Sequence, residues 1–111
     1  MLQEYLSGTE YAVDHASRDG VHKTTMVWVY QKGPANGAGF VDFGEECVPE
    51  CPERQELIAY TRSCLDALHI TNGPTHTELM MTETGPCLVE INSRCHGAGG
   101  AWMPLAQEMV G

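Results

Sequence analysis

The chain has 111 residues, of which 42% are hydrophobic, and its formal net charge is −9. That length suits one small domain with a modest core. The acidic balance excludes a general binding surface for nucleic acid or for anionic membranes, and no apolar run reaches the roughly 18 residues that a transmembrane helix needs.

Two antiparallel strands are predicted around Asp19-Gly20, a dipeptide that is typical of the tight type I′ turn. The strand before the turn alternates over residues 11–16, so that Tyr11 faces one side of the sheet and Asp14 faces the other. The strand after it covers residues 21–32 and is rich in β-branched and aromatic side chains.

The segments on either side of this hairpin have weaker patterns. Residues 1–6 are predicted to be the end of a strand that turns at Ser7-Gly8. Residues 33–46 are rich in glycine and are predicted to be an irregular connection. They lack both the GxGxxG pattern and a terminal Lys-Ser/Thr, so they do not indicate a specific phosphate-binding loop.

A helix is predicted from Pro52 to His69, because proline is favoured in a first helical turn and Glu53 lies at the positive end of the helix dipole. Its predicted core positions recur at helical spacing, and they are Leu57, Thr61, Cys64, Leu65 and Leu68. A second helix is expected from Ala101, with Pro104 in its first turn.

A second hairpin is predicted from two short strands, residues 77–81 and 87–92, with a turn at 84–86. A tight hairpin pairs the early part of its first strand with the late part of its second. Glu78 and Glu90 are therefore expected to meet across the ladder.

The end of this hairpin carries a group of oxygen-bearing side chains. Glu90 and Asn92 are two residues apart and so leave the same face of a strand, opposite Glu78. Mg²⁺ prefers such oxygen donors and shares them with substrate phosphates. Arg94 would supply a fixed cation for phosphate or carboxylate oxygens, and the glycines of residues 96–100 would let backbone N–H groups approach an anion. The alternative, from the residues alone, is a solvated hairpin with two exposed carboxylates.

The cysteines and histidines do not form a clear metal pattern. The odd number of cysteines, five, argues against a disulfide framework and predicts free thiols in a reducing compartment, the cytoplasm. Cys47 and Cys51 could begin a zinc site that another Cys or a His completes. His69 and His76 are predicted to be ordinary polar residues at the edges of elements.

One motif resembles the metal-binding end of the ATP-grasp superfamily. It consists of Glu78, eleven intervening residues with a turn, and then Glu90-Ile-Asn-Ser-Arg94. The resemblance implies that Glu78, Glu90 and Asn92 hold Mg²⁺, with Mn²⁺ as an alternative, on the phosphates of ATP. It also implies that Arg94 lies by the substrate carboxylate and the developing acyl phosphate.

The opening of the chain, QEYLSGTEYAVD, resembles the hinge on the adenine side of the same family. The resemblance implies that Gln3, Glu4 and Leu6 contact adenine and that Glu10 holds the ribose hydroxyls. An extended segment offers a backbone donor and acceptor together, and a carboxylate accepts from both hydroxyls. Lys32 could reach a phosphate or the substrate.

The fold class that follows is α+β, an antiparallel sheet packed against one long helix, as in the C-terminal subdomain of an ATP-grasp fold. Residues 1–111 are expected to form this part of the domain, without the preceding N-terminal lobe and the domain before it. The implied function is the ATP- and Mg-binding half of a ligase. Its partners would be ATP, a small carboxylate substrate, an amine nucleophile and the N-terminal lobe.

Two functions from other classes stay open. A noncatalytic remnant of the fold could bind a nucleotide, a metal or a protein partner, and its open face could favour self-association. A Cys/His zinc domain is the other, and a chelator would unfold it.

Overall fold

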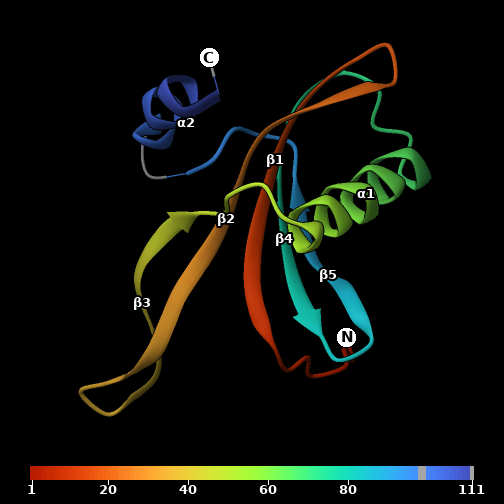
Figure 1. The fold of residues 1–111 in the computed structure, drawn as a ribbon. Helices are drawn as coiled ribbons and strands as arrows, with labels where there is room; N and C mark the ends of the chain where they lie inside the picture. The colour runs from red at the N-terminus through yellow and green to blue at the C-terminus, as the bar shows by residue number, and fades with distance from the viewer. Residues whose placement is uncertain (98–99, 111) are drawn as a thin grey trace.

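The computed structural model describes residues 1–97 and 100–110. The elements in this part of the chain are β1 (Thr9–Arg18), β2 (Val21–Ala35), β3 (Ala38–Cys47), α1 (Pro52–Ala67), β4 (Gly73–Thr82), β5 (Gly85–Asn92) and α2 (Trp102–Val110). The strands form one sheet in the order β3-β2-β1-β4-β5, and every neighbouring pair is antiparallel. The predicted α+β class is confirmed (Figure 1).

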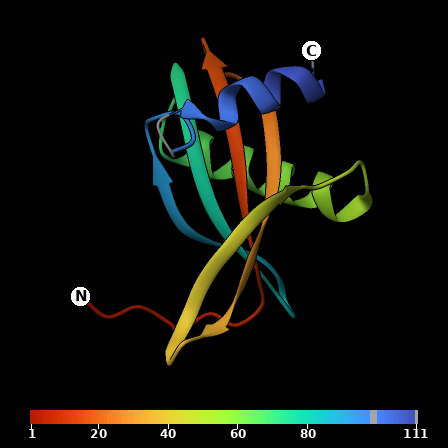
Figure 2. The same cartoon turned by 90° about the vertical axis from the view of Figure 1, so that its left-hand side faces the viewer.

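The two helices lie on opposite sides of the sheet, as the two views in Figures 1 and 2 show. The side under α1 holds the larger apolar cluster, made by Tyr11, Val13, Val27, Val48, Leu57, Ile58 and Leu79. The side under α2 holds a smaller one, in which Trp102 and Ala106 pack against Ala12, Met26 and Trp28. Successive residues of a strand therefore serve different faces, as the pleat requires.

Both tight turns of the first three strands use residues with positive φ. Asp19 and Gly20 have φ of 50° and 79°, which confirms the predicted hairpin between β1 and β2. Asn36 and Gly37 repeat this arrangement, with φ of 49° and 80°, between β2 and β3.

The second turn corrects the prediction for residues 33–46, which form the end of β2 and most of β3 instead of an irregular loop. Glycines lower the intrinsic strand preference of this segment, but Asn36-Gly37 is itself a strong hairpin signal. The prediction for residues 1–6 was also wrong, because this segment has no regular secondary structure and bends at Gly8 before β1.

Helix α1 begins at Pro52, as predicted, and ends at Ala67, two residues before the predicted end at His69. The Cys51 sulfur accepts a hydrogen bond from the backbone N–H of Arg54 at 3.4 Å and caps the first turn. His69 has a φ of 54°, which ends the helical path. Within the described residues, none of the helices has the length and apolar character needed to cross a membrane.

Candidate functional site

The face of the sheet turned away from α1 carries the polar side chains. In the register of β1 with β4, Glu10 lies opposite Met80, Ala12 opposite Glu78, and Asp14 opposite His76. The residues between them in β1, Tyr11 and Val13, belong to the core under α1. Strand alternation alone therefore gathers carboxylates and a histidine on one face.

Glu78 and Glu90 lie directly opposite each other in the ladder of β4 and β5, next to a register shift between Glu78 and Leu79. This is the pairing that the hairpin pattern predicted. Asn92 donates from Nδ2 to Glu90 Oε1 at 2.8 Å, which leaves its own carbonyl oxygen to face a ligand. Glu90 is exposed, and Glu78 and Asn92 are half-buried. Two accessible carboxylates and an amide oxygen fit the chemistry of Mg²⁺.

Tyr30 supports this group from β2. Its hydroxyl donates to Glu78 Oε1 at 3.4 Å. Burial, with added repulsion from the carboxylates of Glu45 and Glu78, raises the pKa of Tyr30. The phenol therefore stays neutral and keeps its proton for the carboxylate.

Arg94 follows β5 and is exposed. Its Nη1 donates to the backbone carbonyl of Cys95 at 3.0 Å. Among the described residues the structure gives Arg94 no ion pair with Glu78 or Glu90. In the glycine-rich stretch after it, residues 98 and 99 lie outside the described part of the chain.

The predicted adenine-side residues line two hollows beside the N-terminal segment and Met80 of β4. Gly8 makes this possible, because it has a φ of 155° and a Cβ there would stand 1.9 Å from the backbone oxygen of Met81. Only glycine lets the N-terminal segment pass so close to β4. Gln3 and Glu4 line one hollow of about 500 Å³, together with Leu6.

Leu6 also lines a neighbouring hollow of about 400 Å³ with Glu10 and Lys32. Lys32 Nζ lies 2.7 Å from Glu10 Oε2, so these two residues form an ion pair at its edge. Met80 lines both hollows. Sequence reasoning missed Met80, although its position two residues after Glu78 already placed it on the same face.

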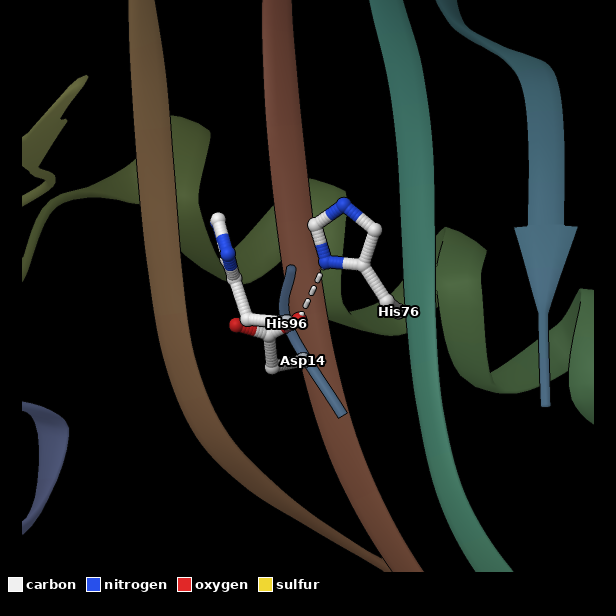
Figure 3. A group of neighbouring side chains, drawn as sticks. All are labelled: Asp14, His76 and His96. Carbon is white, nitrogen blue, oxygen red and sulfur yellow. Dashed lines mark hydrogen bonds and ion pairs between the residues drawn. The ribbon is translucent and has the colours of Figure 1, made fainter. Parts of the chain in front are cut away.

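Asp14, His76 and His96 form a second polar group (Figure 3). It lies beside the paired glutamates, because Nε2 of His76 is 3.5 Å from Glu78 Oε1. It joins β1, β4 and the segment between β5 and α2. His76 donates from Nδ1 to Asp14 Oδ1 at 2.7 Å, and Trp28 donates from Nε1 to Asp14 Oδ2 at 2.9 Å. His76 is only 2% exposed, so the prediction of a polar edge residue was wrong.

Each histidine of this group contacts a carboxylate, which changes the pKa values of the groups involved. Burial lowers the pKa of His76, but the hydrogen bond and charge of Asp14 outweigh that effect and raise it overall. His96 lies 2.7 Å, through Nε2, from Glu45 Oε2. Burial raises the pKa of Glu45, and the contact with His96 only partly offsets this. The register of β1 with β4, which brings residues 14 and 76 together, could not be obtained from local sequence patterns.

The cysteines do not assemble a zinc site in the described residues. Among the described residues, the only group of at least three His, Cys, Asp or Glu side chains placed to share a metal ion is Asp14, His76 and His96, and it contains no cysteine. Cys51 caps α1, and the Cys47 thiol lies 3.3 Å from the sulfur of Met26. All five cysteines are free thiols, as predicted.

No family model matches the chain. Curated proteins that are similar in sequence include a dapdiamide A synthase and carnosine synthases. Dapdiamide A synthase of Enterobacter agglomerans is 33% identical over 111 residues, which is 100% of this chain and 26% of that protein. Carnosine synthase 1 of Gallus gallus is 32% identical over 100 residues, 87% of this chain and 10% of that protein. The chain thus spans about a quarter of the length of the first relative and a tenth of the second.

Solved structures that share the fold include two ligases from Bacillus species. The L-amino acid ligase from Bacillus licheniformis superposes with a TM-score of 0.76 at 23% identity, covering 94% of this chain and 26% of that chain. The D-alanine–D-alanine ligase from Bacillus anthracis complexed with ATP gives a TM-score of 0.60 at 16% identity, covering 80% of this chain and 30% of that chain. The solved structures show the shared fold, and the sequence relatives show that the chain belongs to the ATP-grasp ligase superfamily.

Proposed function

We propose that this chain is the ATP- and Mg-binding part of a ligase that activates a carboxylate and joins it to an amine. The paired glutamates of β4 and β5 carry the proposal, because Glu78 faces Glu90 across the ladder and Asn92 is bonded to Glu90 on the accessible face. The relatives and the structural neighbours are ligases, and one neighbour is complexed with ATP. The names of the two solved ligases favour an amino acid among the substrates.

The proposed reaction has two steps. A carboxylate oxygen of the acid attacks the γ-phosphorus of ATP, the bond to the β-phosphate oxygen breaks, and ADP leaves with an acyl phosphate formed. The amine nitrogen then attacks the acyl carbon, phosphate leaves, and the nitrogen loses a proton. This chemistry needs charge neutralisation and positioning more than a protein nucleophile.

The residues around the paired glutamates have separate roles in this proposal. Glu78, Glu90 and Asn92 would hold Mg²⁺, with Mn²⁺ as an alternative, and the bound ion would neutralise phosphate charge. Tyr30 keeps Glu78 in place through its hydrogen bond. Arg94 would stabilise the negative charge that develops on the transferred phosphoryl group.

ATP itself would extend along the face toward the N-terminal segment. Gln3, Glu4 and Leu6 line the hollow that would take the adenine. Glu10 would bind the ribose hydroxyls, and its ion pair with Lys32 holds both side chains at the edge of the neighbouring hollow. An N-terminal lobe would have to close over the phosphates from the other side.

A thermal melt with Mg-ATP tests the nucleotide and metal face. A ligand that binds only the folded state raises the free energy of unfolding by RT ln(1 + [L]/Kd), which is about 2.7 kcal/mol at a hundredfold excess over Kd. We expect a rise in melting temperature that needs both Mg²⁺ and ATP and that Glu90→Gln abolishes. The matched control is Glu83→Gln, which removes an exposed carboxylate from the turn between β4 and β5.

Two other outcomes have clear meanings. A folded chain that shows no shift at millimolar Mg-ATP would contradict nucleotide binding by this face alone. The chain could also bind Mg-ATP, as shown by a rise in melting temperature, and still release no ADP when an N-terminal lobe, an acid and an amine are supplied. That result would contradict the ligase function. It would favour a noncatalytic nucleotide-binding module.

A further inference from the structure

The proposed ligase chemistry makes no direct use of the buried group beside the paired glutamates. Asp14, His76 and His96 are 8%, 2% and 8% exposed. Each offers one ligand atom, and the three atoms lie within 4.8 Å of one another. We propose that these three side chains bind a divalent transition-metal ion, with Zn²⁺ the best match, at a site separate from the proposed Mg²⁺ site.

The donor set distinguishes this site from the magnesium face. Zn²⁺ takes histidine nitrogen and carboxylate oxygen in a tetrahedral arrangement, whereas Mg²⁺ prefers oxygen donors alone. Two imidazoles and one carboxylate are a common set of three protein ligands, which leaves a fourth position open. Asp14 and His76 come from neighbouring strands, so the rigid sheet places two of the three ligands.

The contacts outside the group are those that metal ligands usually have. A ligating histidine generally gives its other ring nitrogen to a carboxylate or carbonyl oxygen. His96 meets Glu45 through Nε2 at 2.7 Å, and Nε2 of His76 lies 3.5 Å from Glu78 Oε1. Trp28 orients the carboxylate of Asp14 in the same way, through its indole N–H.

One nitrogen of the group is left without a partner. Nδ1 of His96 is buried and has no hydrogen-bond partner among the described residues. Buried polar atoms are nearly always bonded, and an exception needs an explanation. With Nε2 of His96 donating to Glu45, Nδ1 carries a lone pair, and a metal ion would use it.

The Asp14–His76 pair needs only a small movement to admit the ion, and the His96 ligand atom, which lies within 4.8 Å of the other two, would move toward it. His76 Nδ1 and Asp14 Oδ1 are 2.7 Å apart and share a proton. Two ligands of a tetrahedral zinc, each at about 2.0–2.1 Å, are roughly 3.3 Å apart. The ion would take the place of that proton, and the two side chains would separate by roughly 0.6 Å.

The open fourth position has room beside it. A cavity of about 340 Å³ is bounded by Asp14, His96, Lys23 and Trp102. Since His96 belongs to the segment before α2, the ion would fasten that segment and the helix to the sheet. The ring centroid of His96 lies 5.8 Å from that of Trp28 and 5.3 Å from that of Trp102. Indole fluorescence therefore reports binding.

To test this, the 111-residue chain is first treated with a chelator and then titrated with Zn²⁺ in the presence of millimolar Mg²⁺. Binding is measured by calorimetry and by tryptophan fluorescence. We expect one Zn²⁺ per chain and a rise in melting temperature. His96→Ala should abolish this binding, and Glu45→Gln should weaken it by about 10- to 100-fold through the lost outer contact. His69→Ala removes an exposed histidine and should leave it unchanged.

Co²⁺ separates the proposed ligands from the free cysteines. Binding at Asp14, His76 and His96 gives tetrahedral d–d absorption without a thiolate-to-cobalt charge-transfer band. A thiolate band, binding that survives His96→Ala, or no stoichiometric binding would overturn the proposal. Loss of binding in Glu90→Gln would also overturn it, by assigning the ion to the magnesium face. If His96→Ala does not fold, Glu45→Gln decides the question, and unchanged affinity in that variant contradicts the proposal.

Discussion

The two faces of one sheet have opposite chemistry although the same strands build both. Under α1, the side chains of Val13, Val27, Leu57 and Leu79 are fully buried and apolar. On the other face the same strands present carboxylates, a histidine and a lysine, and Glu78 directly faces a second carboxylate across the ladder. Residue alternation thus separates the part that stabilises the fold from the part that would bind ligands.

This difference predicts how substitutions should behave. Burial of apolar surface contributes roughly 25 cal/mol per Å², so the α1 face supplies most of the stability. Like charges on opposing strands are unfavourable, so part of the polar face works against folding. At some positions, substitutions on the two faces should therefore change the free energy of unfolding in opposite directions.

Leu57→Ala should have the largest effect. Leu57 is fully buried between α1 and the sheet. Removing its side chain leaves a cavity and should lower the free energy of unfolding by about 2–5 kcal/mol, as measured by urea denaturation. Leu68→Ala is the control, because Leu68 is 56% exposed at the end of the helix and should lose much less. Equal losses in the two variants would contradict the assignment of the core to this face.

His15, on the α1 side of the sheet, should make the stability of the fold depend on pH. Burial, aided by the charges of Arg62 and His22, lowers the pKa of His15 to about 4 from 6.5. Between these values the unfolded chain binds the proton and the folded chain does not. Stability therefore falls as the pH drops from 6.5 toward 4, in total by about 3 kcal/mol at 1.36 kcal/mol per unit.

His15→Gln should remove the part of the pH dependence of stability that comes from His15. The slope of unfolding free energy against pH should become smaller by up to about 1.4 kcal/mol per pH unit between pH 6.5 and 4.5. Denaturant melts at several pH values measure the slope, and an NMR titration follows the His15 ring directly. An unchanged slope, or a His15 ring that protonates near pH 6.5, would contradict the buried neutral histidine.

Asp14→Ala tests the part of the polar face that does stabilise the fold. Asp14 accepts from Trp28 at 2.9 Å and from His76 at 2.7 Å. Its removal leaves two buried donors unpaired and should cost about 2 kcal/mol, measured by denaturation with a chelator present. Asp14→Asn keeps one acceptor oxygen and should recover part of the loss. Wild-type stability in Asp14→Ala would mean that the hydrogen bonds to Trp28 and His76 do not stabilise the fold.

How far the sequence could be interpreted also follows the two faces. Helix α1, the Asp19-Gly20 hairpin and the pairing of Glu78 with Glu90 follow from local signals, because each depends on residues close in sequence. Strand β3 was not predicted, because its glycines lower the strand preference of the segment and because it is held in the sheet only by its pairing with β2.

The Asp14–His76 contact depends instead on a register between strands 62 residues apart. Alternation correctly places Asp14 away from the core, but it does not say which side chain Asp14 will meet. His96 joins the same group from a segment outside the sheet. A site built from three distant segments requires the assembled fold, whereas one built on a single hairpin does not.

Glu90→Gln should have the smallest effect on stability, and its sign should be opposite to that of the core substitution. Without Mg²⁺, the carboxylates of Glu78 and Glu90 repel each other across the ladder. Glutamine keeps an oxygen to accept the hydrogen bond from Asn92. The variant should therefore be more stable by about 0.2–1 kcal/mol at low salt, and added NaCl should shrink the gain. Glu83→Gln in the adjacent turn controls for net charge. A loss of stability in Glu90→Gln at low salt would mean that this pair is held by contacts within the protein, and the case for a cation between the two carboxylates would then weaken.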